Sequence, residues 1–391
     1  MPSKFFKIFL TLFLSVFITT MGAGIIGPLL PIYAHDLGAS AFQIGLIFAA
    51  FSFTRSIFVP YFGRLSDIKG KKPILLTGLL IYFFLSILYC LSNGVWHLIF
   101  LRLTQGFASA MILPVAQAYI GIITPETYEG RIMGLFNVSL YGGLSAGPIV
   151  GGIVKDYSGM KYSFLSMGIL ALIGFFLCFM LLPARNKEPV LKKTTEKIVS
   201  YMSIIKNFTI FNLFFFRVCF TICIGIMWTF LPLIASTRFG FSSTKIGILL
   251  SIHVLSSGIF QIPMGYLADK FNKKLIIISG GIMGIGSVLC LASTCLFWKI
   301  AVINALLGLS AGISIPAVMA MSVIEGRKLG AMGSIMGLMA QAHSVGMFFG
   351  PILAGILMEF VSFKWIFIIA GLILSIGTFM IYFLPSPSLD N

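Results

Sequence analysis

The stretch Gly63-Arg-Leu-Ser-Asp-Ile-Lys-Gly-Lys-Lys-Pro73 returns in related form 202 positions later, as Gly265-Tyr-Leu-Ala-Asp-Lys-Phe-Asn-Lys-Lys-Leu275. Each copy carries one aspartate and several basic residues, and each lies between long apolar runs. Polar turns between apolar segments predict neighbouring membrane-spanning helices, and their repetition predicts two homologous halves. Paired halves with a site between them are the layout of secondary transporters.

The composition supports a membrane environment. Of the 391 residues, 58% are hydrophobic and 10% are charged, and the mean hydropathy is +1.04. A water-soluble domain could not bury so large an apolar fraction. An apolar segment of roughly 20 residues spans the hydrocarbon core as a helix. Twelve such segments are present, at 8–33, 42–62, 73–93, 96–122, 132–154, 162–182, 207–235, 244–266, 275–294, 298–323, 331–358 and 363–384. We therefore expect an all-α membrane protein with twelve transmembrane helices in two pseudo-symmetric six-helix bundles.

The repeat extends beyond the two turns. At the offset of 202, Gly106 coincides with Gly308 and Pro114 with Pro316; at an offset of 203, Gly143, Gly147 and Pro148 coincide with Gly346, Gly350 and Pro351. Six helices return the chain to its starting side, so the halves are parallel repeats. We expect an N-terminal bundle at 1–182, a polar cytoplasmic linker at 183–206 and a C-terminal bundle at 207–391.

The net charge of +16 is explained by topology. Cytoplasmic loops of membrane proteins are enriched in Lys and Arg. With the N-terminus inside, eighteen of the 27 Lys and Arg residues lie in or beside cytoplasmic segments and six lie outside. This distribution predicts a multi-pass protein of the cell membrane with both termini in the cytoplasm. The basic residues are scattered over turns and form no single stripe, so no nucleic-acid partner is expected.

Four motifs, in the expected order along the chain, resemble the major facilitator superfamily. The turn at Gly63 resembles the signature between the second and third helices, with Ile68 where a basic residue is usual. Met21-Gly22 followed by Pro28-Leu-Leu-Pro31 is similar to the first-helix pattern of the twelve-helix drug:proton antiporter branch. Arg102-Leu-Thr-Gln-Gly106 resembles the fourth-helix motif. Gly143-x-x-x-Gly147-Pro-x-x-Gly151-Gly152 resembles the fifth-helix motif of exporters.

The resemblance implies a conformational switch at the repeated turns. Asp67 would meet the start of the eleventh helix, and Lys71 would pair with Glu126 at the end of the fourth. Such contacts form only when the halves close on the cytoplasmic side, so they would stabilise the outward-open state. The residues assigned to this switch are Gly63, Asp67, Lys71, Glu126, Gly265, Asp269 and Lys273.

Small residues indicate close packing of the fifth and eleventh predicted helices. Gly143, Gly147 and Gly151 are four apart and share one face, which lets two backbones approach each other in lipid. The same face would equally suit a low-friction surface between the halves. The residues assigned to helix packing are Pro28, Pro31, Gly143, Gly147, Pro148, Gly151, Gly152, Gly346, Gly350 and Pro351.

The predicted membrane interior holds cations and no carboxylate. All eleven acidic residues map to loops or helix ends, and intramembrane charges are costly and usually functional. The residues assigned to coupling or to the substrate cavity are Arg55, Arg102, Gln105, Asn137, Tyr141, Arg217, His253, Gln261, Gln341 and His343. Cavity arginines favour neutral or anionic amphiphiles over permanent cations. Each histidine is either a packing residue or a proton carrier.

These features predict a secondary active transporter that exports small amphipathic or hydrophobic compounds by alternating access, coupled to protons. A facilitator or exchanger of a small anionic metabolite is the alternative, because the arginines lack intramembrane carboxylate partners. No nucleophile with a base, no metal-ligand cluster and no phosphate loop points to an enzyme, so neither a metal nor a cofactor is expected. The expected partners are a small-molecule substrate, the lipid bilayer and protons, and we expect a monomer.

Overall fold

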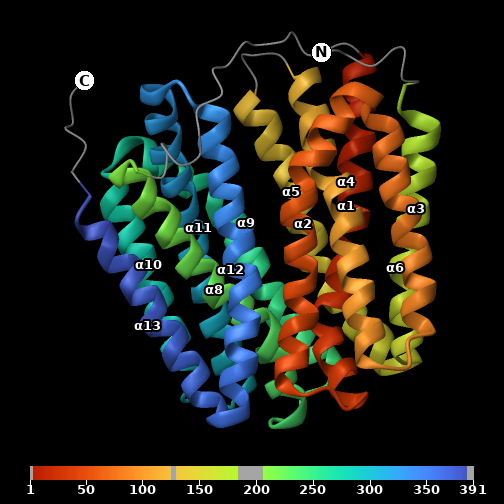
Figure 1. Cartoon of the computed structure of the whole chain (residues 1–391), viewed down its shortest axis with the longest axis vertical. Coiled ribbons are helices and arrows are strands. Elements are labelled where there is room, and N and C mark those ends of the chain that lie inside the picture. Colours follow the sequence, from red (N-terminus) through yellow and green to blue (C-terminus); the bar gives the residue numbers. More distant parts are fainter. Residues whose placement is uncertain (1–2, 125–128, 184–205, 385–391) are drawn as a thin grey trace. The chain divides into compact units, whose positions relative to one another are not determined.

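The computed structural model describes residues 3–124, 129–183 and 206–384, and this part of the chain contains twelve helices and no strand (Figure 1). The predicted all-α fold is confirmed. The helices are α1 (Ser3–Asp36), α2 (Ala41–Lys69), α3 (Lys71–Cys90), α4 (Val95–Ile123), α5 (Glu129–Ser158), α6 (Met160–Leu181), α8 (Phe208–Thr237), α9 (Ser243–Lys270), α10 (Lys273–Leu291), α11 (Phe297–Leu329), α12 (Met332–Phe360) and α13 (Phe363–Tyr382). The predicted linker falls almost wholly outside the described residues.

Most of these helices are suited to a lipid environment. Within the described residues, eleven helices are long and apolar enough to cross a membrane. Helix α5 is not among them, although it contains the predicted span at 132–154. Its sequence is rich in glycine, which contributes little hydropathy. The composition of α5 therefore serves packing more than lipid contact.

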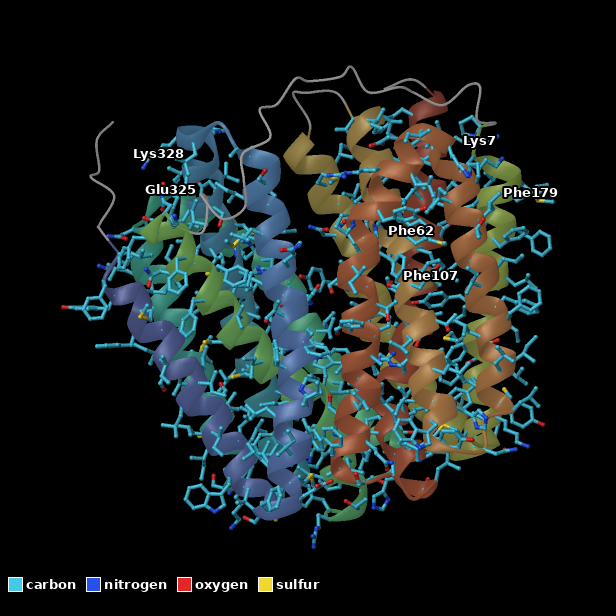
Figure 2. All side chains as sticks on the ribbon, in the orientation of Figure 1. Lys7, Phe62, Phe107, Phe179, Glu325 and Lys328 are labelled. Atoms are coloured by element: carbon cyan, nitrogen blue, oxygen red, sulfur yellow. The ribbon has the colours of Figure 1, made fainter. Side chains whose placement is uncertain are left out.

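The first compact unit comprises Met1–Lys193 together with Pro232–Ser251. Within it α1 packs against α5 and α6, α2 packs against α4, and α3 packs against α4 and α6. Several α1 side chains are fully buried, including Ile25 and Leu29. Phenylalanines fill the interface between α2 and α4, where Phe62 and Phe107 lie edge to face with ring centroids 5.0 Å apart (Figure 2).

The second unit comprises Thr194–Leu231 together with Ile252–Asn391. Here α10 packs against α11 and α13, as α3 packs against α4 and α6 in the first unit. The contact of α9 with α11 likewise repeats that of α2 with α4. A Cβ added at Gly308 would collide with the His253 backbone, and one at Gly106 would collide with the Phe51 backbone. The sequence repeat is therefore also a repeat of helix packing.

Single glycines reverse the chain where one helix follows another without a longer loop. Gly70 stands between α2 and α3 with a φ of 88°, and Gly159 stands between α5 and α6 with a φ of 93°. Residues with a Cβ adopt such angles only at a cost. Gly70 in the first copy of the repeated turn is therefore explained by the positive φ that the turn requires.

Candidate functional site

The glycine face of α5 lies against α1. A Cβ added at Gly151 would lie 2.7 Å from the Ile25 carbonyl oxygen, and Cβ atoms at Gly143 and Gly147 would come closer still to the α1 backbone. No side chain fits into separations of this size, which are typical of small-residue helix contacts in membranes. The structure thus brings these three predicted packing residues to one helix interface.

Helix α12 makes the same contact in the second unit, against α8. Cβ atoms at Gly346 and Gly350 would collide with the α8 backbone, and one at Gly225 of α8 would lie 2.9 Å from the Pro351 ring. The predicted packing prolines lie inside helices, Pro28 and Pro31 in α1, Pro148 in α5 and Pro351 in α12. The two glycine motifs therefore hold equivalent helix pairs together.

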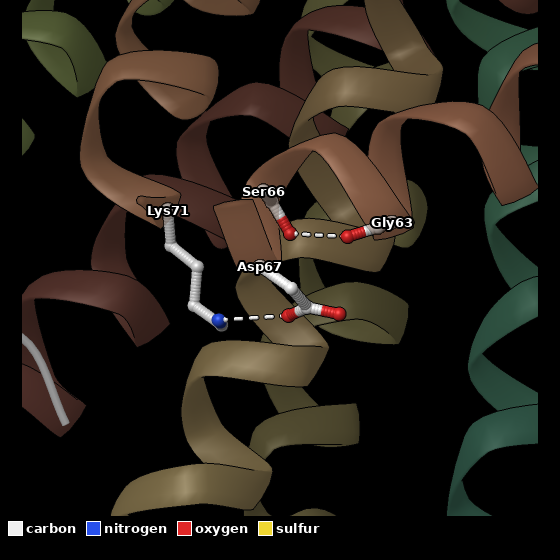
Figure 3. A network of polar contacts seen from close by, with 4 residues as sticks. All are labelled: Gly63, Ser66, Asp67 and Lys71. Atoms are coloured by element: carbon white, nitrogen blue, oxygen red, sulfur yellow. Dashed lines mark hydrogen bonds and ion pairs between the residues drawn. The ribbon is translucent and has the colours of Figure 1, made fainter. Parts of the chain in front are cut away.

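The turn between α2 and α3 brings three polar side chains together (Figure 3). Lys71 Nζ lies 3.1 Å from a carboxylate oxygen of Asp67, and the Ser66 hydroxyl donates a 2.7 Å hydrogen bond to the Gly63 carbonyl. The Lys71 side chain is 6% exposed, whereas that of Asp67 is 54% exposed. The family resemblance implies a pair between Lys71 and Glu126. Because Glu126 lies outside the described residues, that pair stays a prediction; one observed partner of Lys71 is Asp67.

The second copy of the turn, between α9 and α10, begins its helix differently. Asn272 replaces Gly70, and its side chain accepts a 3.0 Å hydrogen bond from the backbone N–H of Lys274. Asparagine is a favoured N-cap because its side-chain oxygen satisfies a free helix donor. Of the predicted switch residues here, Gly265 and Lys273 are half-buried, and the side chain of Asp269 lies outside the described residues.

Lys72 and Lys274 occupy equivalent positions in the two turns and bind equivalent helix ends. Lys72 Nζ donates to the carbonyl oxygens of Phe179 and Leu182, each at 2.7 Å. Lys274 Nζ donates to the Leu384 carbonyl at 2.7 Å. Each ammonium group thus binds the C-terminal end of the last helix of its own half, where the helix dipole is negative. From the distribution of charge along the sequence, these lysines are assigned only to fixing the membrane topology. Their occurrence at equivalent positions of both repeats could have indicated that they bind helix ends.

A buried polar cluster links α2, α3 and α4. Arg102 Nη1 donates to Gln105 Oε1 at 2.9 Å, and the Tyr89 hydroxyl donates to the same oxygen at 3.0 Å. Arg102 Nε also donates to the Ile47 carbonyl at 3.4 Å, and the guanidinium lies over the Phe51 ring, 4.6 Å from its centroid. The observed partners of this cation are therefore an amide, a carbonyl and aromatic rings, which are neutral groups.

Arg55 of α2 extends this cluster. Its guanidinium lies near the Tyr82 side chain of α3, and the Tyr82 hydroxyl lies near Ser109 and Gln105 of α4. Arg55 Nε is buried without a hydrogen-bond partner in the described part of the chain. The structure thus brings Arg55, Arg102 and Gln105 together, and it adds two tyrosines that the sequence reasoning missed. Tyr82 and Tyr89 are seven residues apart, which places both on one face of α3 and could have indicated them.

The remaining predicted cavity residues lie on other helices. His253 of α9 is 4% exposed and lies beside the backbone of Asn304 in α11, while its Nδ1 atom has no partner among the described residues. Arg217 of α8 is also buried. Asn137, Tyr141, Gln261 and His343 are half-buried, and Gln341 is exposed. Within the described residues, no group of His, Cys, Asp and Glu could hold a metal ion.

The end of α5 meets the start of α9 in a contact that the sequence reasoning missed. The Asp156 carboxylate accepts hydrogen bonds from the backbone N–H groups of Ser243 at 3.1 Å and Thr244 at 2.8 Å, and from the Thr244 hydroxyl at 2.7 Å. Partial burial opposes its ionisation, but these bonds outweigh burial and hold the pKa of Asp156 below its ordinary value. The carboxylate lies beyond the predicted span at 132–154. We call Gly152, Asp156, Ser243, Thr244 and Gly247 the α5–α9 corner.

The fold and these contacts define the class of protein: a helical membrane transporter built from two similar six-helix halves. The family model of the Major Facilitator Superfamily matches residues 12–242 and 213–391, and the chain belongs to this superfamily. Transporters of this superfamily are not enzymes, which confirms that prediction.

Relatives across almost the whole chain agree with this assignment. An uncharacterized MFS-type transporter of Methanocaldococcus jannaschii is 30% identical over 355 residues, covering 89% of this chain and 90% of that protein. Multidrug resistance protein 2 of Bacillus subtilis is 26% identical (95% and 93% covered), and the quinolone resistance protein NorA of Staphylococcus aureus is 24% identical (89% and 89% covered).

Two solved structures share the fold. A bacterial homolog of the human lysosomal transporter Spinster matches with a TM-score of 0.81 at 12% identity, covering 98% of this chain and 97% of that chain. The human organic anion transporter MFSD10 matches with a TM-score of 0.68 at 15% identity, covering 97% and 100%. At these identities the likeness concerns architecture alone.

Proposed function

We propose that this protein is a secondary transporter that exports small amphipathic or hydrophobic compounds by alternating access. The glycine motif of α5 supports this proposal, because it resembles the fifth-helix motif of exporters, and its glycines pack α5 tightly against α1. The two bacterial relatives named for multidrug and quinolone resistance support the same substrate class. In this proposal both termini face the cytoplasm, so the turn between α2 and α3 lies on the cytoplasmic side and the α5–α9 corner on the outer side.

The observation that carries the substrate preference is the buried cluster around Arg55 and Arg102. The acidic residues of the described helices lie within a few residues of helix ends, so neither arginine has an intramembrane carboxylate beside it there. A buried cation without an anionic partner repels a second cation and attracts an anion, and low polarity strengthens both effects. We therefore propose that neutral and anionic amphiphiles are preferred to permanent cations.

Proton coupling is part of the same proposal. Guanidinium groups do not release protons at physiological pH. The proton would therefore move on His253, on His343, on the substrate, or on the edge carboxylates Asp67 and Asp269. His253 is buried, and its Nδ1 atom has no partner among the described residues.

The test uses purified protein in liposomes under an imposed pH gradient. Transport and binding of a permanent cation are compared with those of an organic anion of similar hydrophobicity. We expect the anion to be preferred, and we expect Arg55→Gln to reduce that preference about tenfold, the effect of one lost charge-assisted contact. Arg64→Gln is the matched control, because it removes an exposed arginine from the end of the same helix. Strong proton-driven transport of the permanent cation, unaffected by His253→Ala with His343→Ala, would overturn the proposal.

The arginines of the cluster, which have no carboxylate beside them in the described part of the chain, also favour a second candidate function, the exchange of a small anionic metabolite. The two functions differ in what drives the substrate. An exchanger carries labelled anion against unlabelled anion without a pH gradient, and it discriminates against large apolar compounds. Counterflow of a small hydrophilic anion with no response to a pH gradient would select this alternative.

A further inference from the structure

The first turn of α9 takes part of its N-terminal cap from α5 rather than from its own sequence. A helix leaves its first four N–H groups without intrahelical partners. In α9, Asp156 satisfies two of them, those of Ser243 and Thr244, and its charge lies at the positive end of the helix dipole. The Thr244 hydroxyl adds a third bond to the same carboxylate.

The sequence at the start of α9 explains why its backbone N–H groups need an acceptor from another helix. Ser242 accepts a hydrogen bond from the Lys245 N–H at 3.4 Å, which begins a local cap. A complete capping box needs Glu or Gln at the third helical position, whose side chain accepts from the backbone of the cap residue. Lys245 has no acceptor atom, and its positive charge is unfavourable at a helix N-terminus. Asp156 supplies the acceptor and the negative charge that Lys245 does not.

The backbones also pack closely at this corner. A Cβ added at Gly152 would collide with the Ser243 backbone, and one at Gly247 would collide with the Pro148 carbonyl. An apolar cluster of Ile32, Ala235 and Ile246 accompanies these contacts, with Phe239 and Phe241 packed against it. All these residues belong to the first compact unit. The start of α9 is thus attached to helices of the N-terminal half, although α9 belongs to the C-terminal half of the sequence.

We infer that the α5–α9 corner is a conformational latch that holds the outer side of the transporter closed, with the Asp156 carboxylate as its polar element. The inference rests on the proposed alternating access, in which the outer ends of the two sequence halves separate to open the site outward. The hydrogen bonds of Asp156 exist only while α5 and α9 touch, so they stabilise the outward-closed state alone, and a differential contact of this kind shifts populations. The contact consists of one partly exposed carboxylate and a small glycine interface. Such a contact is weak enough to break and re-form in each transport cycle.

The experiment measures the opening of the outer side directly. Spin labels are placed in a cysteine-free background at Tyr162 and Trp298, two exposed aromatic residues at the starts of α6 and α11. Distances between them are recorded by pulsed electron paramagnetic resonance, without substrate. We expect Asp156→Asn to raise the ratio of long to short distances about two- to fivefold, which is the effect of a helix-terminal charge at a partly exposed site. Thr244→Val removes only the hydroxyl bond and should shift the ratio in the same direction by less.

Asp36→Asn is the matched control. It removes a carboxylate from the end of α1, on the same side, that is 62% exposed and contacts His35 rather than a helix start. An unchanged distance distribution in both Asp156→Asn and Thr244→Val, or an equal shift in Asp36→Asn, would overturn the latch. The readout requires no transported compound. A shift specific to Asp156→Asn therefore supports the latch even if the drug-export assay fails. Export without the shift refutes the latch and leaves the proposed transport function standing.

Discussion

The N-termini of α2 and α9 are equivalent in the repeat, yet they are capped in different ways. In α2, Ser40 and Gln43 form a complete capping box, with bonds of 2.9 Å and 3.3 Å between each side chain and the other's backbone. In α9 the serine is kept as Ser242, but Lys245 stands where α2 has Gln43. One helix start is therefore self-sufficient, whereas the other depends on a carboxylate from α5. The two halves thus share a fold but differ in how these equivalent helix N-termini are capped.

The bundle ends at the two repeated turns show the opposite behaviour. Lys72 and Lys274 both bind the C-terminal end of the last helix of their own half. These contacts join residues of the same half, so a relative movement of the halves leaves them intact. The contact of Asp156 joins different halves of the sequence. The difference separates contacts that maintain a bundle from a contact that responds to movement.

The largest expected effect comes from forcing the α5–α9 corner apart. Gly247→Val places a side chain where even a Cβ would collide with the Pro148 carbonyl. Overpacking of a close contact costs about 1–3 kcal/mol, so we expect the outward-closed population and the transport rate in liposomes to fall about tenfold. Gly286→Val in α10 is the control, because a Cβ there meets nothing within 4 Å. Equal loss of transport in both variants would show a general effect of valine in a helix.

A smaller effect is expected from giving α9 the cap that α2 has. Lys245→Gln creates a Ser-x-x-Gln box at the start of α9, worth about 1 kcal/mol to the helix. In this background we expect Asp156→Asn to change the outer distance distribution about half as much as it does alone. The measurement is a double-mutant cycle on the ratio of long to short distances. Strict additivity would mean that Asp156 does not act as a cap.

The sequence predicted the fold correctly because its strongest patterns are periodic. Twelve apolar runs and a repeated turn give twelve helices and two similar halves. Glycines four apart predicted a contact face, but not that α1 would be its partner. Gln105 follows Arg102 by three residues, so helical spacing could have predicted their contact.

The corner contact was beyond the sequence for a physical reason. Asp156 and Thr244 are 88 positions apart, and no periodicity joins them. The repeat gives no guidance either, because the residue equivalent to Asp156 is Glu359 and the helix start equivalent to α9 caps itself. Tyr82 and Tyr89 were missed because tyrosines on an apolar helix most often serve packing. Their contacts with Gln105 depend on how three helices meet.

Lys72 and Lys274 allow a test of the contacts that are equivalent in the two halves. Each variant, Lys72→Met and Lys274→Met, removes one ammonium group from a helix C-terminus and keeps the apolar stem. We expect each to lower the Tm of the purified protein by a similar small amount, corresponding to roughly 0.5–1 kcal/mol, with the outer distance distribution unchanged. Lys69→Met is the control, an exposed lysine in the same turn. A Tm loss confined to one of the two lysines would break the symmetry argued here.

The last prediction concerns pH and an effect expected to be absent. Hydrogen bonds hold the pKa of Asp156 below its ordinary value of 3.8. A carboxylate with a lowered pKa contributes its full stabilisation above the ordinary pKa and loses it as the pH falls through the lowered one. The Asp156 bonds should therefore be complete from pH 8 to pH 5, and the distance distribution across the outer side should not change over that range in the Asp156→Asn variant or in the native chain. A change in the distance distribution of the native chain between pH 8 and pH 5 that is absent in Asp156→Asn would contradict the lowered pKa of Asp156.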